Sequence, residues 1–230
     1  MAKRPSNPIL LPIFGGQGTL SFNPEDGSRR FRQLTSSPTG MVLLDACFDA
    51  LHAELASLPA EVVQQVGICA NDFMHKSSLL CPEREEYLSN PVISGSTLLL
   101  LQVSKFLYYV ESSAAPRNNL NRLDSLLQSN AQYGVGVLGF SSGIIAATVV
   151  AASRTKLDFI RHAVEAYRLA FWIGVRSQLF RMSYTSNSTG IFQDFRPWAL
   201  VIFALDRSAM QQALLSFNEV FFFFCVCNSI

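Results

Sequence analysis

A serine flanked by glycines lies past the middle of the sequence, in the pentapeptide Gly139-Phe140-Ser141-Ser142-Gly143. This is the G-x-S-x-G pattern of a nucleophile elbow, a tight strand-to-helix turn that presents a serine hydroxyl above a sheet. The glycines lack a Cβ and let the strand and the helix approach closely. The chemistry expected of Ser141 is nucleophilic attack on a carbonyl carbon.

The residues around the motif supply the context that an elbow needs. The run from Gly134 to Ala152, GVGVLGFSSGIIAATVVAA, reads as a small-residue apolar strand followed by a short apolar helix. The backbone N–H of Ser142 would point, with the N-terminus of that helix, at an oxyanion formed on the attacked carbonyl. The alternative is a serine that only caps a buried, glycine-rich helix. The strand-turn-helix context favours the nucleophile.

A second glycine-rich loop, Gly15-Gly16-Gln17-Gly18-Thr19, follows a predicted buried strand from Ile9 to Phe14. Glycines directly after such a strand indicate a backbone that comes close to something else. One explanation is a tight turn, and the other is a bound anion or a reacting carbonyl group. The loop by itself leaves both open.

Residues 134–139 also fit the dinucleotide fingerprint G-x-G-x-x-G, and Asp158 follows at a suitable distance. That fingerprint requires a strand before the first glycine and a helix that opens at the last one. Here the residues before Gly134 are polar, and the glycines lie inside the predicted strand. We therefore reject a dinucleotide site.

Long apolar helices are predicted to position these loops. Hydrophobic periodicity predicts an amphipathic helix over Met41–Leu58, an almost uniformly apolar helix from Pro91 to Val110, and a third helix over Thr155–Arg176. Polar and basic residues predict a helix-poor surface excursion over Ser21–Thr39. Near the C-terminus, Trp198–Leu205 reads as a strand and Ser208–Asn218 as a helix.

Composition excludes several classes of function. The 230 residues include 18 Lys and Arg and 17 Asp and Glu, and a formal net charge of +1 gives no sign of nucleic-acid binding. Five cysteines and three histidines show no metal-binding spacing, and we expect reduced, buried thiols in a cytoplasmic protein.

Pro12 breaks the N-terminal apolar run, so no signal peptide is expected. Gln102 and Lys105 interrupt the apolar run Thr97–Val110, so no membrane span is expected.

Four segments, Phe14–Gly18, Pro91–Glu111, Gly139–Gly143 and Glu165–Arg176, carry a family resemblance that extends from about Ile9 to Asn218. Together they resemble the starter-unit acyltransferase domain of fungal non-reducing polyketide synthases. That domain belongs to the malonyl-CoA:ACP transacylase-like superfamily. The combination of segments is specific, although no single motif is.

The resemblance implies an α/β fold, with a hydrolase-like acyltransferase core whose parallel sheet is flanked by helices, and a small ferredoxin-like subdomain. Residues 1–196 would form an incomplete acyltransferase core, and residues 197–218 the first strand and helix of the ferredoxin-like subdomain. Residues 219–230, VFFFFCVCNSI preceded by Glu219, would be a tail foreign to the family. We therefore expect a truncated or mis-spliced product.

The resemblance also implies a reaction. Ser141 would take a starter acyl group from acyl-CoA or an acyl carrier protein and pass it to the acyl carrier protein of the synthase. The backbone amides of Gln17 and Ser142 would form the oxyanion hole. Arg168 matches, at a different spacing, the arginine that holds a substrate carboxylate in malonyl-specific relatives. No metal or resident cofactor is implied, and neither a nucleic acid nor a membrane is an expected partner.

The sequence departs from the family pattern in two respects. Most starter domains carry cysteine where Ser141 stands, and the catalytic histidine that follows the ferredoxin-like insert is absent. None of His52, His75 and His162 is assigned as the base, so we expect a poor or inactive transferase. Two alternatives stay open: a non-catalytic remnant that binds a carrier protein, and a serine esterase or thioesterase. The second would need an acid and then a histidine after the serine.

Overall fold

The computed structural model describes residues 11–16, 24–82, 85–112, 122–133 and 136–187. The chain divides into two units, residues 1–187 and residues 188–230, and the second lies outside the described residues. The predicted C-terminal strand and helix, and with them the ferredoxin-like subdomain, also lie outside the described part of the chain.

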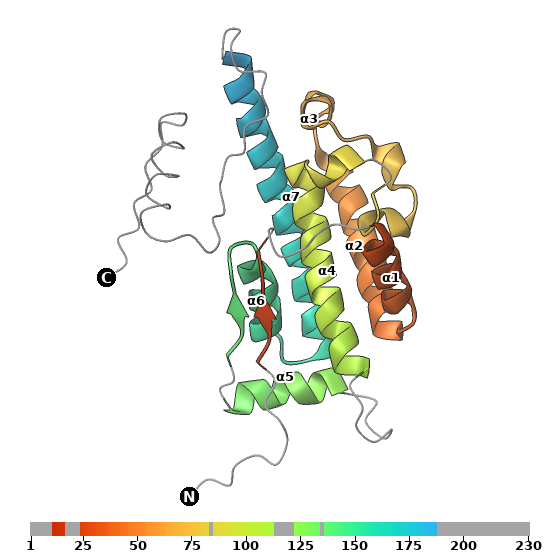
Figure 1. The fold of residues 1–230 in the computed structure, drawn as a ribbon, viewed down its shortest axis with the longest axis vertical. Coiled ribbons are helices and arrows are strands. Elements are labelled where there is room, and N and C mark those ends of the chain that lie inside the picture. Colours follow the sequence, from red (N-terminus) through yellow and green to blue (C-terminus); the bar gives the residue numbers. More distant parts are fainter. Residues whose placement is uncertain (1–10, 17–23, 83–84, 113–121, 134–135, 188–230) are drawn as a thin grey trace, which may run out of the picture. The chain divides into compact units, whose positions relative to one another are not determined.

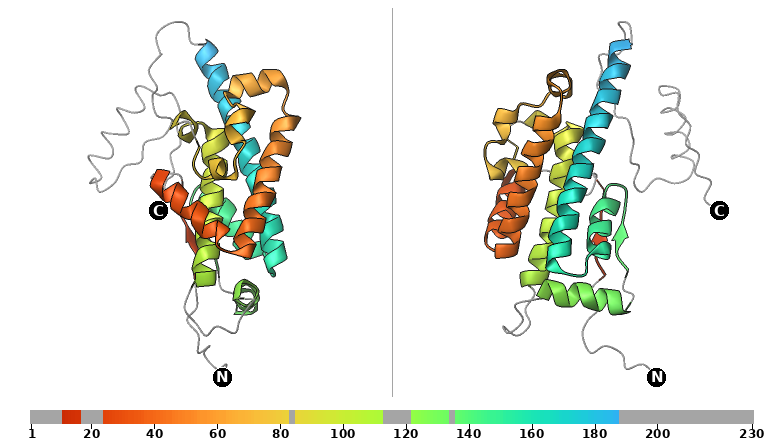
Figure 2. Two further views of the ribbon diagram at one scale, coloured as in Figure 1. Left: turned by 90° about the vertical axis from the view of Figure 1, so that its right-hand side faces the viewer. Right: turned by 180° about the vertical axis from the view of Figure 1, so that it is seen from behind.

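Two long helices, α4 (Pro91–Ser112) and α7 (Lys156–Asn187), lie side by side at the centre of the first unit (Figure 1). On one side of this pair lie α1 (Pro24–Thr35) and α2 (Pro38–Ser57). On the other side lies α6 (Gly143–Ala152), beside the two strands, as the view from behind also shows (Figure 2). The core therefore forms on both sides of the central helix pair.

The helix predicted from Pro91 is confirmed as α4, and its sequence explains both its start and its position. Pro91 occupies the first turn, where a missing N–H is tolerated, and the Asn90 side chain accepts a hydrogen bond from Val92 N at 3.0 Å. Apolar side chains on nearly every face of α4 are buried. A helix that is apolar all round has to be surrounded by protein.

The prediction for Ser21–Thr39 is wrong over residues 24–35, which form α1, and α2 begins shortly after. The polar composition concealed one buried stripe, because Leu34 is 3% exposed and Phe31 packs against the core. A Cβ on Gly27 would lie 2.5 Å from the carbonyl oxygen of Leu80, so this glycine lets α1 approach the chain at that point. Burial of the stripe outweighs the weak helix propensity of the segment.

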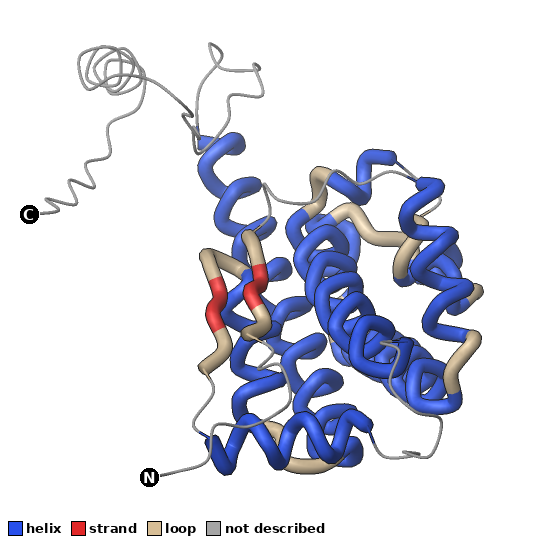
Figure 3. The backbone as a smooth tube through the Cα atoms, turned by 60° about the horizontal axis from the view of Figure 1, so that its bottom comes forward, coloured by secondary structure: helices blue, strands red, loops and turns tan. Residues whose placement is uncertain are grey.

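The sheet of the described residues has two short parallel strands, β1 (Ile13–Phe14) and β2 (Leu138–Gly139), shown in red in Figure 3. Ile13 is opposite Leu138 and Phe14 is opposite Gly139. The α/β expectation therefore holds in part. A small two-stranded parallel sheet is present, with α6 packed against it, but the described residues are mostly helical.

Helix α7 runs to Asn187, beyond the end predicted at Arg176, and a capping box opens it. The hydroxyl of Thr155 accepts a hydrogen bond from Asp158 N, and the Asp158 carboxylate accepts one from Thr155 N, both at 3.1 Å. The hydrogen bond with the Thr155 side chain is the main cause that lowers the pKa of Asp158. Asp158, which lies at a dinucleotide-like distance from the glycines, is thus a helix cap.

Short helices complete the described unit. Helix α3 (Ala60–Val66) follows α2, and α5 (Arg122–Tyr133) packs against α4 and α6. Three 3₁₀ helices lie between α3 and α4 in the described chain, at Ala70–Phe73, Lys76–Leu79 and Glu85–Leu88. Among the described residues, no helix combines the length and the apolar character that crossing a membrane requires.

Candidate active site

Ser141 has the backbone conformation expected of an elbow. Its φ is +52°, and it is the one non-glycine residue of the described chain with a positive φ. An L-residue in this left-handed region is strained by about 1–2 kcal/mol. β2 ends two residues before Ser141 and α6 begins two residues after it, and the side chain is exposed. The strand-turn-helix context predicted from the sequence is therefore confirmed.

Both glycines of the motif are required by close backbone contacts. A Cβ on Gly139 would lie 2.6 Å from the carbonyl oxygen of Gly143, inside the first turn of α6. A Cβ on Gly143 would lie 2.5 Å from the carbonyl oxygen of Gly15, in the loop after β1. The first glycine thus lets the strand meet its own helix, and the second lets that helix meet the neighbouring strand.

The first glycine-rich loop lies against the elbow. A Cβ on Gly16 would lie 2.8 Å from Cβ and 3.3 Å from Oγ of Ser141. Parallel pairing of the two strands brings about this contact, because both loops leave the same edge of the sheet. Gln17 lies outside the described residues, so the structure carries no position for its amide.

The start of α6 leaves one amide available beside Ser141. The N–H of Gly143 donates to Phe140 O at 2.9 Å, and the N–H of Ile144 donates to Ser141 O at 3.1 Å. Within the described part of the chain, no backbone acceptor is bonded to the N–H of Ser142, which precedes these two. That amide is the expected oxyanion donor of an elbow.

Gln102, on α4, connects the two loops to the helix core. Its Nε2 donates to the carbonyl oxygen of Gly15 at 2.5 Å, and the residue is 6% exposed. Its Oε1 and the Oγ of Ser142 are buried, and neither has a hydrogen-bond partner among the described residues. Sequence reasoning treated Gln102 only as an interruption of an apolar run. A glutamine inside a helix that is apolar all round was the available signal, because a buried amide needs a partner.

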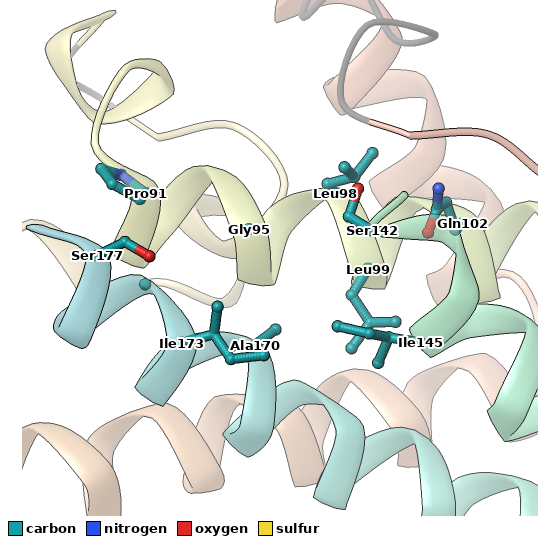
Figure 4. Close-up of a pocket in the computed structure, with 11 residues that line it drawn as sticks. Pro91, Gly95, Leu98, Leu99, Gln102, Ser142, Ile145, Ala170, Ile173 and Ser177 are labelled. Atoms are coloured by element: carbon teal, nitrogen blue, oxygen red, sulfur yellow. The ribbon is translucent and has the colours of Figure 1, made fainter. Parts of the chain in front are cut away.

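A cavity of about 100 Å³ borders the elbow between α4, α6 and α7. Ser142 and Gln102 lie at one end of it, and the view in Figure 4 shows it continuing along α4 and α7 past Gly95 to Pro91 and Ser177. Its walls are otherwise mainly apolar, with Leu98, Leu99, Ile145, Ala170 and Ile173 among them. Ser142, the neighbour of Ser141, is the residue of the elbow that lines it, and a mainly apolar cavity with a few polar atoms is a typical ligand site.

Arg168 is not brought to this site. Its Nε lies 3.5 Å from a carboxylate oxygen of Glu54 on α2, and the other oxygen of Glu54 accepts a hydrogen bond from Trp172 Nε1 at 2.8 Å. The residues of α7 that line the cavity include Ala170 and Gly174. At about 100° per residue, Arg168 lies roughly 200° from Ala170 around the helix. It therefore faces away from the cavity.

All three histidines are described, and two of them, His52 and His162, contact groups other than Ser141. His162 Nδ1 is 3.2 Å from the hydroxyl of Ser153, which ends α6 at the far end from the elbow, roughly 16 Å along the helix axis. His52 Nε2 is 3.0 Å from the carbonyl oxygen of Phe73, and His75 is exposed. Among the described residues, no three His, Cys, Asp or Glu side chains cluster so as to hold a metal ion.

Comparison with known proteins identifies relatives along almost the whole chain. A family model described as "Starter unit:ACP transacylase in aflatoxin biosynthesis" matches residues 12–220. The orsellinic acid synthase ArmB of Armillaria ostoyae is 38% identical over 214 residues, which are 93% of this chain. An orsellinic acid synthase of Beauveria bassiana is 26% identical over 221 residues, also 93% of the chain. These matches confirm the resemblance drawn from the sequence.

A more distant relative is a fatty acid synthase subunit. The β subunit of Aspergillus oryzae is 29% identical over 168 residues, 72% of this chain and 8% of the subunit. The chain spans only 9% of the length of the two orsellinic acid synthases. It therefore corresponds to one segment of much larger relatives.

Proposed function

The chain belongs to the starter unit:ACP transacylase family, and on this premise we propose that Ser141 carries a starter acyl group between a thioester donor and an acyl carrier protein. The observation that supports this most directly is the strained backbone of Ser141, with φ +52°, next to Gly16. A serine held in this conformation at a cost in free energy, between two sterically required glycines, is typical of a nucleophile.

The proposed reaction has two symmetric halves. Ser141 Oγ attacks the carbonyl carbon of the donor thioester, and the carbonyl electron pair moves onto oxygen. The oxyanion accepts hydrogen bonds from the amides of Ser142 and Gln17. The C–S bond then breaks, and the thiol leaves with the proton that Ser141 gave up. In the second half, the thiol of the carrier protein attacks the acyl-serine and restores the hydroxyl group.

Removal of the proton from the Ser141 hydroxyl is the step that we expect to be slow in this chain. A serine hydroxyl is far from ionised at neutral pH and needs a base within hydrogen-bond reach. His52 and His162 contact other groups, and none of the hydrogen bonds recorded for the described residues joins a histidine to Ser141, so acylation of Ser141 is expected to be slow. The same observation favours a second candidate function, in which the segment binds a carrier protein without catalysing transfer.

Intact-protein mass spectrometry after incubation with acetyl-CoA, malonyl-CoA or butyryl-CoA tests the proposal. We expect one acyl group on the wild-type chain, mapped by proteolysis to Ser141, and none on Ser141→Ala. Ser57→Ala removes an exposed hydroxyl from the end of α2 and is the matched control. A label on Ser142, or a label that survives in Ser141→Ala, would overturn the assignment. Binding of a carrier protein without any label would favour the second candidate.

A further inference from the structure

Gly95 is a glycine in the interior of α4 that close packing does not require. Glycine is less favourable than alanine inside a helix, so its presence there needs a reason. A Cβ on Gly95 would meet one neighbouring atom, the carbonyl oxygen of Ala170, at an ordinary contact distance of 3.7 Å. An alanine would therefore fit at this position without any shift of the surrounding atoms.

Gly174, on the facing helix, shows the contrast. A Cβ there would lie 2.5 Å from the carbonyl oxygen of Pro91, so Gly174 is needed for α7 to approach α4. Both glycines line the same cavity. Of these two glycines, Gly95 is the one with room for a methyl group, and it borders the middle of the cavity (Figure 4).

The residues at the end of the cavity next to the elbow have polar atoms without partners in the described part of the chain. Gln102, which is 6% exposed, and Ser142 both line the cavity, and the Oε1 of Gln102 and the Oγ of Ser142 are buried without a hydrogen-bond partner among the described residues. Between these residues and Ser177, at the far end, the side chains that line the cavity are apolar and include Leu98, Leu99 and Ile173 (Figure 4). A ligand with a polar head at Ser142, the residue after Ser141, and an aliphatic tail fits this distribution, because buried polar atoms need partners and apolar walls do not.

The volume of the cavity limits how much of the tail can be buried, and the cavity is not fully enclosed, because the wall residue Ile173 is 49% exposed. A dry cavity of about 150 Å³ holds a benzene molecule, which has six carbon atoms. By the same proportion, the volume of about 100 Å³ corresponds to about four carbon atoms. A chain that fills the cavity must contact Gly95, which lines it.

We infer that this cavity receives the acyl chain carried by Ser141, that it selects short aliphatic acyl groups, and that Gly95 is a specificity-determining residue. The inference rests on the proposed function of Ser141 and deepens it. A side chain at position 95 shortens the acyl group that can be held, whereas removing part of a wall side chain lengthens it.

The test compares acetyl-, butyryl- and octanoyl-CoA in the rate of covalent labelling of Ser141. In the wild-type chain, butyryl labelling is expected to be at least tenfold faster than octanoyl labelling. Gly95→Ala is expected to slow butyryl labelling at least fivefold and to leave acetyl labelling within twofold. The matched control is Gly136→Ala, because a Cβ at this exposed position meets no atom within 4 Å.

Ile173→Ala tests the opposite direction. Ile173 is 49% exposed and lines the cavity, so its truncation enlarges the space with little loss of core packing. Octanoyl labelling is expected to rise at least fivefold relative to butyryl labelling. The inference is overturned if the wild-type chain accepts octanoyl as readily as butyryl, or if neither variant changes the chain-length profile.

A binding measurement separates this inference from the proposed function. Acetamide, butyramide and octanamide are titrated against Ser141→Ala, with and without Gly95→Ala, by ligand-observed NMR. Failure of every thioester to label the wild-type chain overturns the acyl-transfer role. In that case butyramide binding that Gly95→Ala weakens at least fivefold still supports the pocket, and binding that is indifferent to Gly95→Ala refutes it.

Discussion

The α-carbon of Gly143 faces the carbonyl oxygen of Gly15 so closely that a Cβ on residue 143 would lie 2.5 Å from that oxygen. This contact joins the start of α6 to the loop after β1, and the same loop places Gly16 against Ser141. The geometry around Ser141 therefore depends on two segments that lie more than a hundred residues apart in the sequence.

Gly143→Ala should distort the elbow and destabilise the chain. The added methyl group meets backbone atoms that cannot rotate away, and such overpacking costs about 1–3 kcal/mol in the free energy of unfolding. Urea denaturation measures the change, and Gly136→Ala, which points into open space, should differ from wild type by less than about 0.5 kcal/mol. Equal stability of the two variants would contradict the contact.

Ser141→Gly should be more stable than Ser141→Ala. Glycine adopts a φ of +52° without strain, whereas alanine keeps the strain of an L-residue there. The extra freedom of glycine in the unfolded chain offsets part of the gain, so a difference of about 0.5–1 kcal/mol in the free energy of unfolding is expected. Both variants should be unlabelled by acyl-CoA. An alanine variant as stable as the glycine variant would argue against a strained elbow.

Gln102→Leu should slow the labelling of Ser141 by about tenfold, equivalent to about 1.4 kcal/mol, with a smaller effect on folding. The variant removes the hydrogen bond from Gln102 to Gly15 O. It also removes the buried Oε1 of Gln102, which has no hydrogen-bond partner among the residues that the structure describes. These two losses act on stability in opposite directions. Gln102 is a positioning residue in this view, since it holds the loop beside Ser141.

The control for Gln102 lies on the same helix. Ser104 is buried and its hydroxyl donates to Leu100 O, without contact to the glycine loop. Ser104→Ala should therefore leave the labelling rate within twofold of wild type. If Gln102→Leu and Ser104→Ala behave alike, the bond to Gly15 does not position the loop.

Arg168→Gln should leave labelling by both acetyl-CoA and malonyl-CoA within twofold. The Arg168 side chain is 41% exposed and pairs with Glu54, so its loss should cost less than about 1 kcal/mol in the free energy of unfolding. Glu54→Gln should lower the free energy of unfolding more than Arg168→Gln, because Glu54 also accepts a hydrogen bond from Trp172 Nε1. A selective loss of malonyl labelling in Arg168→Gln would instead support the role in carboxylate binding that the family resemblance implies.

Alkaline pH should destabilise the chain through Cys47. Burial raises the pKa of this thiol from 9.0 to about 12. Between these values the unfolded chain loses a proton that the folded chain retains, so the free energy of unfolding falls as pH rises. The slope approaches about 1.4 kcal/mol per pH unit. Burial also raises the pKa of Tyr167, which adds a change of the same sign at higher pH.

Urea denaturation of wild type and Cys47→Ala at pH 8, 9, 10 and 11 measures this effect. The variant should show a shallower decline above pH 9 than wild type. Parallel pH profiles for the two chains would show that Cys47 titrates alike in the folded and unfolded states.

Elements governed by neighbouring residues could be predicted well. The elbow follows from glycine, serine and glycine at fixed spacing, because the steric limits on φ act within a few residues. Pro91 and Asn90 likewise predict the start of α4, since capping is local. Helix α1 was missed because its few buried side chains, such as Leu34, are stabilised by contacts with other segments.

The sequence by itself determined the family, the strand-turn-helix around Ser141 and the apolar helices that surround it. Only the tertiary structure decided that Gln102 bonds to Gly15, that Arg168 turns to Glu54, and that Gly95 opens a cavity beside the elbow. A helix such as α4 is apolar on nearly every face, so its own sequence does not specify which face meets which neighbour. That choice follows from packing the whole unit at once, where close contacts such as Gly174 against Pro91 admit few arrangements.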